Sequence, residues 1–396
     1  MRPTCRHCVG VVIAALAVVS PVHSAPAPVP EHVPVTTPVH ATPYSPEGAE
    51  EQGLWMEVDE TERRLKTSPQ LISDPALNGY VRSVLCRTVG ERQCAAARLY
   101  ILRTPEANAS MAPNGMIQLN SGMLLHLTSE AQLASVLGHE FAHYEHRHAL
   151  LFFRESKKKN SASLWLAMTG IGLLAAFGIE NSLFRYSRDM EREADMDGLR
   201  RMAAAGYAQS EAVAPWKLLR AEWDGTAAER KRRSHSISDD KADGTHPSMA
   251  ERIAYTEAEA AKQAPGAEIG TAPYQAALGR WLPGFLDDQV KRNDFGASDV
   301  LIAQLAERTH SPWLLVAHGD LYRTRAQPGD LDKAAGFYGE ALAADGDLPL
   351  ARRGRGLTLL KLGRADEAKA DLRAYLARSP DAPDRAMIAM LAGEHP

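Results

Sequence analysis

Two histidines in one short motif have the residue types and the spacing to hold a metal ion. His139 and His143 are four residues apart, so on an α-helix they lie on one face and can bind one cation together. Glu140 follows the first histidine and is placed to accept a proton from a water bound to that cation. A His-Glu-x-x-His motif of this kind predicts a catalytic zinc site, which needs a third protein ligand.

A second acidic cluster, further along the chain, is expected to supply that third ligand. Glu191 and Asp195 are four residues apart and share a helix face, whereas Glu193 points roughly 200° away from Glu191. We assign Glu191 as the ligand and Asp195 as the carboxylate that accepts a hydrogen bond from a zinc-bound histidine. Taken alone, these acids would form a solvated helix face. A three-histidine site is excluded, because it needs glycine and histidine where His146 and Ala149 stand.

The residues around both motifs favour helices. Apolar positions three and four apart run through 131–137, and Ser129 can cap the start of that helix. The segment 187–195 consists mainly of good helix formers. Two helices are therefore expected to bring the metal ligands together.

A short strand is expected ahead of the first motif. The residues 113–115, Pro-Asn-Gly, predict a turn, and the strand after it consists of Met116, Ile117, Gln118 and Leu119. We expect this strand to offer an exposed edge, to which a substrate peptide adds through main-chain hydrogen bonds with its scissile carbonyl near zinc. The alternative is an ordinary hairpin edge with no role in binding.

In these motifs the chain resembles the HExxH…ExxxD gluzincin metallopeptidases related to HtpX, Oma1 and BepA. The resemblance covers roughly residues 100 to 255 and extends to three further landmarks, Arg147-His148, Thr245-His246-Pro247-Ser248 and Arg252-Ile253. It implies an endopeptidase with one Zn²⁺ per chain, whose ligands and general base are the residues assigned above.

His246 is the second candidate catalytic residue. By its residue type and polar surroundings alone it would be exposed and idle, but its place in the resemblance indicates that it faces the cleft. It could donate a hydrogen bond to the oxyanion of the tetrahedral intermediate. It could also bind the open zinc position and latch the enzyme shut. His246→Ala would lower the activity in the first case and raise it in the second.

The N-terminal residues predict export. Residues 1–24 combine two arginines, an apolar run and small residues at the end, which is typical of a secretory signal peptide. Residues 25–50 are rich in proline and valine and are expected to form an extended, disordered linker. The formal net charge of −4 becomes more acidic without the two arginines, which argues against nucleic acid as a partner. Cys86 and Cys94 could then close a small disulfide loop, or remain two reduced thiols.

An apolar run at 164–179 separates the two metal motifs. As a helix its sixteen residues span about 24 Å, short of the ~30 Å hydrocarbon core of a bilayer. A single crossing would also place His143 and Glu191 on opposite sides of a membrane. We expect a buried helix, an interfacial helix that makes peripheral membrane contact, or a hairpin that dips into lipid.

The last third of the chain predicts helical repeats. Gly319 and Gly356 are 37 residues apart, close to the ~34-residue period of tetratricopeptide helix pairs. We expect residues 266–396 to form a tetratricopeptide-like array that binds proteins on its concave side. The alternative is that these helices only cover the catalytic domain, residues 51–265.

Together these features predict a mainly α (α+β) fold, with a zincin-like metalloprotease domain that contains a small β-sheet and a helical repeat array behind it. The predicted function is that of a periplasmic zinc endopeptidase that hydrolyses misassembled envelope proteins. By family resemblance, the repeats would engage the outer-membrane assembly machinery. The alternative is a usually latched, chaperone-like factor that acts through its repeats. The short apolar run disfavours an intramembrane protease.

Overall fold

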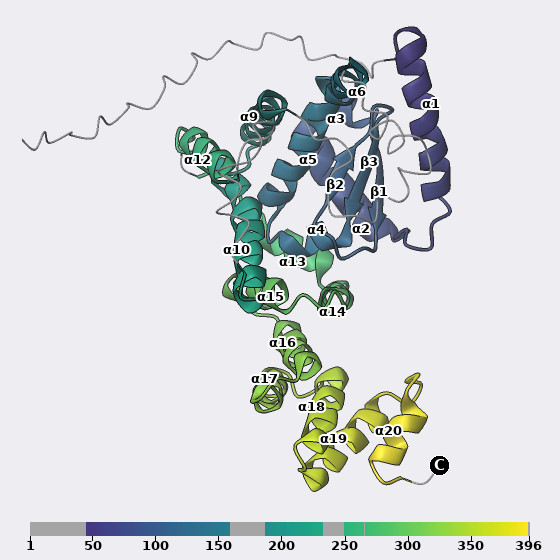
Figure 1. The fold of residues 1–396 in the computed structure, drawn as a ribbon, viewed down its shortest axis with the longest axis vertical. Coiled ribbons are helices and arrows are strands. Elements are labelled where there is room, and N and C mark those ends of the chain that lie inside the picture. Colours follow the sequence, from purple (N-terminus) through teal and green to yellow (C-terminus); the bar gives the residue numbers. More distant parts are fainter. Residues whose placement is uncertain (1–44, 159–186, 233–248, 265, 395–396) are drawn as a thin grey trace, which may run out of the picture. The chain divides into compact units, whose positions relative to one another are not determined.

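The protein is mainly helical with one small sheet (Figure 1). The structure is a computed structural model that describes residues 45–158, 187–232, 249–264 and 266–394. The predicted fold class, with helical repeats after a metallopeptidase-like domain, is confirmed. The predicted signal peptide, most of the predicted linker, the apolar run 164–179 and His246 lie outside the described residues. Within the described ranges no helix is both long enough and apolar enough to span a bilayer.

Three strands form the sheet, in the order β1 (Arg98–Leu102), β3 (Met116–Asn120) and β2 (Ala109–Met111). The central strand β3 pairs in parallel with β1 and antiparallel with β2. The turn between β2 and β3 lies where it was predicted, with the main-chain N–H of Gly115 donating to the carbonyl of Ala112.

The prediction that β3 offers the exposed edge is wrong. Met116, Ile117, Gln118 and Leu119 are all buried, and the main chain of β3 is paired on both sides. Alternation of apolar and polar residues normally marks a half-exposed strand. Here the polar member, Gln118, is also buried and donates to Asn120, 3.2 Å away. The edge strands of the described sheet are β1 and β2 instead.

The two metal motifs lie on helices α5 (Glu130–Glu145) and α9 (Arg188–Ala204), as predicted. Each helix begins with a serine cap, Ser129 for α5 and Ser187 for α9. The helices pack against each other where Gly138 faces Gly198. A Cβ atom added to Gly198 would lie 3.2 Å from the main-chain nitrogen of His139, so a larger residue would push the helices apart.

Further helices surround this pair. Helices α2 and α3 are joined by the disulfide between Cys86 and Cys94, which confirms that alternative for the two cysteines. The other elements up to the end of α12 are α1 (Gly48–Leu65), α2 (Pro75–Val89), α3 (Glu91–Cys94), α4 (Ser121–His126), α6 (His148–Lys158), η1 (Gln209–Val213), α10 (Ala214–Glu229) and α12 (Met249–Ala260).

The C-terminal helices contain the predicted repeats. Gly319 and Gly356 lie on the first helix of two successive pairs and face Tyr338 and Leu372 on the second helix. The helices of this region are α13 (Thr271–Leu278), α14 (Leu282–Lys291), α15 (Phe295–Arg308), α16 (Pro312–Arg325), α17 (Asp330–Ala344), α18 (Pro349–Lys361), α19 (Ala365–Arg378) and α20 (Arg385–Leu391).

The hydrophobic core continues across the predicted domain boundary at residue 266. One cluster of buried side chains reaches from Ile72 to Leu321, and the hydroxyl of Tyr274 donates to the carbonyl of Leu124 over 2.7 Å. Helices α13 to α16 therefore pack onto the same core as the metal helices. Helices α17 to α20 are built around separate small clusters.

A buried carboxylate ties α1 to the sheet. Glu62 accepts hydrogen bonds from Arg98 at 2.6 Å, from the Tyr100 hydroxyl at 2.7 Å and from the Asn114 amide at 3.0 Å. Burial alone would raise the pKa of Glu62, but the hydrogen bonds from Arg98 and Tyr100 outweigh it and lower the pKa to about 2. The ionised carboxylate therefore stabilises the attachment of α1 to the strand and to the turn ahead of β3.

We expect Glu62→Gln to lower the free energy of unfolding at pH 7 by about 2 kcal/mol, because charged hydrogen bonds are lost. Since the pKa of Glu62 is lower in the folded state, its contribution is present above pH 4.5 and is lost as the pH falls towards 2. The difference between the two proteins in urea unfolding should therefore shrink over this range. Glu60→Gln, on the exposed side of the same helix, is the control. A difference that stays constant with pH would contradict this account.

Candidate metal centre

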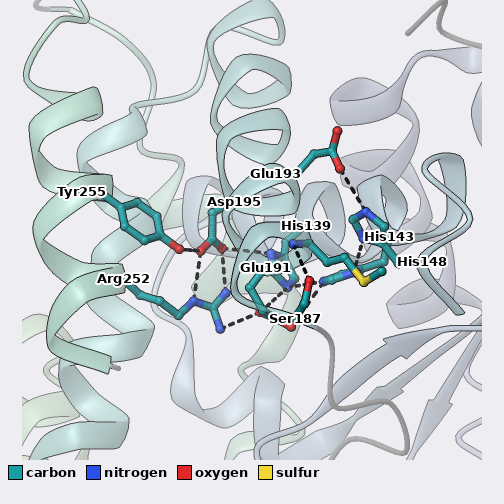
Figure 2. A network of polar contacts seen from close by, with 10 residues as sticks. His139, His143, His148, Ser187, Glu191, Glu193, Asp195, Arg252 and Tyr255 are labelled. Carbon is teal, nitrogen blue, oxygen red and sulfur yellow. Dashed lines mark hydrogen bonds and ion pairs between the residues drawn. The ribbon is translucent and has the colours of Figure 1, made fainter. Parts of the chain in front are cut away.

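Three ligand atoms converge between α5 and α9 (Figure 2). The Nε2 atoms of His139 and His143 are 3.0 Å apart. The carboxylate of Glu191 lies 3.7 Å from the first of these nitrogens and 3.8 Å from the second. Neighbouring ligands of a tetrahedral zinc ion are separated by about 3.3 Å, given bond lengths of about 2.0–2.2 Å. The 3.7 Å distance is to Oε2 of Glu191 and the 3.8 Å distance is to Oε1, so the two nitrogens and the carboxylate are spaced to hold a zinc ion with one open position.

No other group of three His, Cys, Asp or Glu side chains in the described part of the chain brings its ligand atoms this close. Glu193, the acid that helix geometry turns away from Glu191, instead contacts His146 and His148. Glu191, and not Glu193, is therefore the carboxylate that faces His139 and His143.

Asp195 lies behind the first histidine. Its Oδ1 atom is 2.9 Å from Nδ1 of His139, so the carboxylate can hold the ring with Nε2 turned to the other ligands. Burial opposes the charge of Asp195, but the Arg252 guanidinium and the His139 hydrogen bond outweigh it and lower the pKa. Tyr255 also donates to Asp195, so Arg252 and Tyr255 both reach it from α12 (Figure 2).

Arg252 links the ligand to the carboxylate behind it. Its Nη1 atom is 3.0 Å from Glu191, and its Nη2 atom is 2.6 Å from Asp195. The guanidinium carbon lies 3.8 Å from the ring centre of Trp216, so the cation stacks on an aromatic face. The sequence marked Arg252 only as a landmark of the resemblance. Its pairing could not be predicted, because Asp195 is 57 positions away on another helix.

Glu140 lies on α5 beside the ligands, in a setting that favours its neutral form. Burial raises the pKa of Glu140 to about 7, with Glu191 adding to the rise and His139 and Arg252 opposing it. A hydrogen bond from the main chain of Met111, on β2, lowers the pKa in part. A carboxyl group with a pKa near neutrality can both accept and return a proton.

The free edge of β2 faces this site. Main-chain hydrogen bonds join Asn120 to Asn108 and Ala112 to Met116 across the β2–β3 pair. Because bonded and non-bonded residues alternate in an antiparallel pair, the main-chain groups of Ala109 and Met111 point away from β3. The hydrogen bond from Met111 to Glu140 has this direction.

His148 does not continue helix α5. His148 instead begins α6, and its Nδ1 atom is 2.8 Å from Nδ1 of the ligand His143. Burial lowers the pKa of His148 to about 4, although Glu193 opposes this, so the ring is neutral at pH 7. His146 stacks on His148 and lies 3.5 Å from Glu193.

We expect Asp195→Asn to weaken zinc binding by about 10- to 100-fold, because a neutral amide holds the His139 ring less firmly than a carboxylate. The dissociation constant is measured by competition with a chelator of known affinity. Asp189→Asn, an exposed position on the same helix, is the control and should bind zinc as tightly as the unchanged protein. Equal affinities for both variants would show that Asp195 does not act on the metal ligand.

Comparison with known proteins shows what the region around this site is similar to. Residues 75–260 match Peptidase family M48, and residues 322–393 match a tetratricopeptide repeat. The first match contains both metal motifs, the free edge strand and Arg252. The second begins near the end of α16 and runs through α20.

Three relatives carry related sequences. A putative beta-barrel assembly-enhancing protease of Vibrio cholerae is 31% identical over 166 residues, 37% of this chain and 33% of the relative. The beta-barrel assembly-enhancing protease of Escherichia coli K12 is 27% identical over 161 residues, with the same shares. The mitochondrial metalloendopeptidase OMA1 of Arabidopsis thaliana is 36% identical over 115 residues, 27% of this chain and 22% of the relative.

The chain thus spans a third or less of the length of these relatives. These relatives fall into two groups, and both groups are named as peptidases. Residues 75–260 are therefore similar to peptidase family M48, and residues 322–393 of the same chain are similar to tetratricopeptide repeats.

Proposed function

We propose that this protein is a zinc-dependent endopeptidase. The observation that carries the proposal is the convergence of His139, His143 and Glu191, with ligand atoms within 4.8 Å of one another and Glu140 on the same helix as the histidines. The family of residues 75–260 supports it. A zinc ion held by these three side chains would polarise the carbonyl of a peptide bond and make a water more acidic.

Glu140 is the general base in this proposal. Its carboxylate accepts a proton from the attacking water and passes it to the leaving amine. A pKa near 7 suits both steps, because the group can exist in either form at neutral pH. Arg252 and Asp195 have a different part, since they fix the positions of Glu191 and His139.

The edge of β2 is the proposed binding site for the substrate main chain, in place of β3. A peptide that adds to this edge would be held by the outward main-chain groups of Ala109 and by the outward carbonyl of Met111, because the Met111 N–H donates to Glu140. Met111 also contacts Glu140, so the added strand would pass beside the base. Main-chain recognition is compatible with many substrate sequences.

We expect Glu140→Gln to lower casein cleavage by about 10²- to 10⁴-fold, because the amide cannot accept the proton. One zinc per chain should remain bound, since the three ligands are unchanged; metal analysis of the same sample checks this. Glu60→Gln, an exposed change of the same kind, should retain full activity. Full cleavage by Glu140→Gln would refute the mechanism.

The periplasm is the proposed setting, with envelope proteins as substrates. Two relatives are named for enhancing beta-barrel assembly. The disulfide between Cys86 and Cys94 suits an oxidising compartment. The N-terminal residues have the composition of a signal peptide. The outer-membrane assembly machinery is then a candidate partner of the repeats.

A second candidate function is protein binding through the repeats. Tetratricopeptide pairs present surfaces to other proteins, and α16 to α19 form two such pairs. The helices beyond α16 pack around their own small cores and not around the core that contains the metal helices. Their outer surfaces are therefore candidates for binding other proteins. A chaperone-like role would need these surfaces and not the metal centre.

Cells that lack the native gene can separate the two functions. We expect Glu140→Gln to fail to clear a misassembled envelope protein, while the unchanged protein clears it, because the proposed function requires hydrolysis. The measurement is the half-life of that substrate together with the yield of correctly assembled outer-membrane protein. If Glu140→Gln gives the same substrate half-life and the same yield of assembled protein as the unchanged protein, the binding role is favoured instead.

A further inference from the structure

We propose that His148 is a positioning residue for the metal ligand His143, through a hydrogen-bond relay that ends at Glu193. Nδ1 of His143 lies 2.8 Å from Nδ1 of His148, and Nε2 of His148 lies 3.1 Å from Oε2 of Glu193 (Figure 2). The inference rests on the proposed function, because it concerns a ligand of the proposed zinc site. It gives roles to His148 and Glu193, two residues to which the metal motifs assign none.

The direction of each hydrogen bond in the relay follows from the chemistry of imidazole. A neutral histidine that binds a metal through Nε2 carries its proton on Nδ1. His143 is therefore the donor to His148, whose own Nδ1 must accept. The proton of neutral His148 then lies on Nε2, where it is donated to the carboxylate of Glu193. Each atom has one role, and no two donors face each other.

Glu193 selects the tautomer of His148 in this scheme. With the proton on Nδ1 instead, His148 would present a donor to the donor of His143, and its Nε2 lone pair would face a carboxylate. Both hydrogen bonds would be lost. His148 is 1% exposed and His143 is 3% exposed, so water cannot readily replace either bond.

A break in the helix brings His148 to this place. A residue five positions beyond His143 on a continuous helix would lie roughly 140° around its axis and could not face the same ring. Helix α5 ends at Glu145, and Arg147 adopts a left-handed conformation with φ 54° before α6 begins. This conformation is unfavourable for a residue with a side chain and recurs where surrounding structure enforces it. The Arg147 side chain lies 3.8 Å from Glu51, which is fully buried on α1.

The two ligand histidines thus have parallel support from one helix. Asp195 reaches His139 directly, whereas Glu193 reaches His143 through the interposed ring of His148. Both carboxylates lie on α9, which also carries the ligand Glu191. A single helix would then provide one ligand and orient the other two.

The test compares two replacements of His148 in the full-length protein. His148→Asn keeps an acceptor, since its Oδ1 occupies about the position of the ring Nδ1, whereas His148→Leu has none. The zinc dissociation constant is measured by chelator competition, and the absorption spectrum of the cobalt-substituted protein reports on ligand geometry. We expect His148→Leu to bind zinc about 10- to 100-fold more weakly and to show an altered cobalt spectrum. His148→Asn should recover most of both losses.

Two further variants keep the test decisive if His148→Leu folds poorly. Glu193→Gln leaves both histidines in place but removes the charge that selects the tautomer, so zinc binding should weaken by about 10-fold. His146→Leu removes the ring that stacks on His148 at 5.5 Å and should leave the zinc affinity unchanged. The melting temperature of each protein is measured in parallel.

The outcomes separate this inference from the proposed function. Unchanged zinc affinity in Glu193→Gln and in a folded His148→Leu would overturn the relay but not the proposed function. Equal losses of zinc affinity in His148→Leu, His148→Asn and His146→Leu would also overturn the relay, because they would indicate an effect of packing. Failure of the unchanged protein to bind one zinc per chain would overturn the proposed function itself.

Discussion

The close approach of helices α5 and α9 is the constraint on which the metal centre depends. The side chain of Glu191 on α9 can reach the two imidazoles on α5 only if the axes of these helices lie close together. Glycines allow this close approach, because they face each other where the helices cross. Gly138 directly precedes the first histidine, and a Cβ at Gly198 would crowd the main chain of His139. The same contact that packs the core therefore also sets the separation of the proposed ligands.

Charge compensation is the second constraint, because several ionisable groups share a largely buried space. Glu191 and Asp195 would repel each other without a cation between them, and Arg252 supplies one that contacts both. The planar guanidinium suits this task, since it donates to two carboxylates and stacks on Trp216 at the same time. Removing Arg252 would leave two buried carboxylates unpaired on one side, so α12 contributes to the centre although it carries no ligand.

Elements outside the metal helices support the site from several directions. Helix α1 contacts the turn before β3 through Glu62 and the residue before α6 through Glu51. Helices α13 to α16 share the core with α5 and α9, so the repeat-like region and the domain that contains α5 and α9 are not independent packing units at that junction. The alternative prediction was that the C-terminal helices only cover the catalytic domain. It describes α13 to α16 better than α17 to α20.

Local spacing in the sequence determined the parts of this protein that depend on helix geometry. The fixed twist of an α-helix places His139 with His143 and separates Glu191 from Glu193, and serine caps mark where both helices begin. Only the tertiary structure decided that β3 is the central strand and β2 an edge strand, and that Arg252 contacts Glu191 and His148 contacts His143. These relations join segments that are distant in sequence or separated by a helix break, and packing between elements, not periodicity within one element, decides which side chains meet.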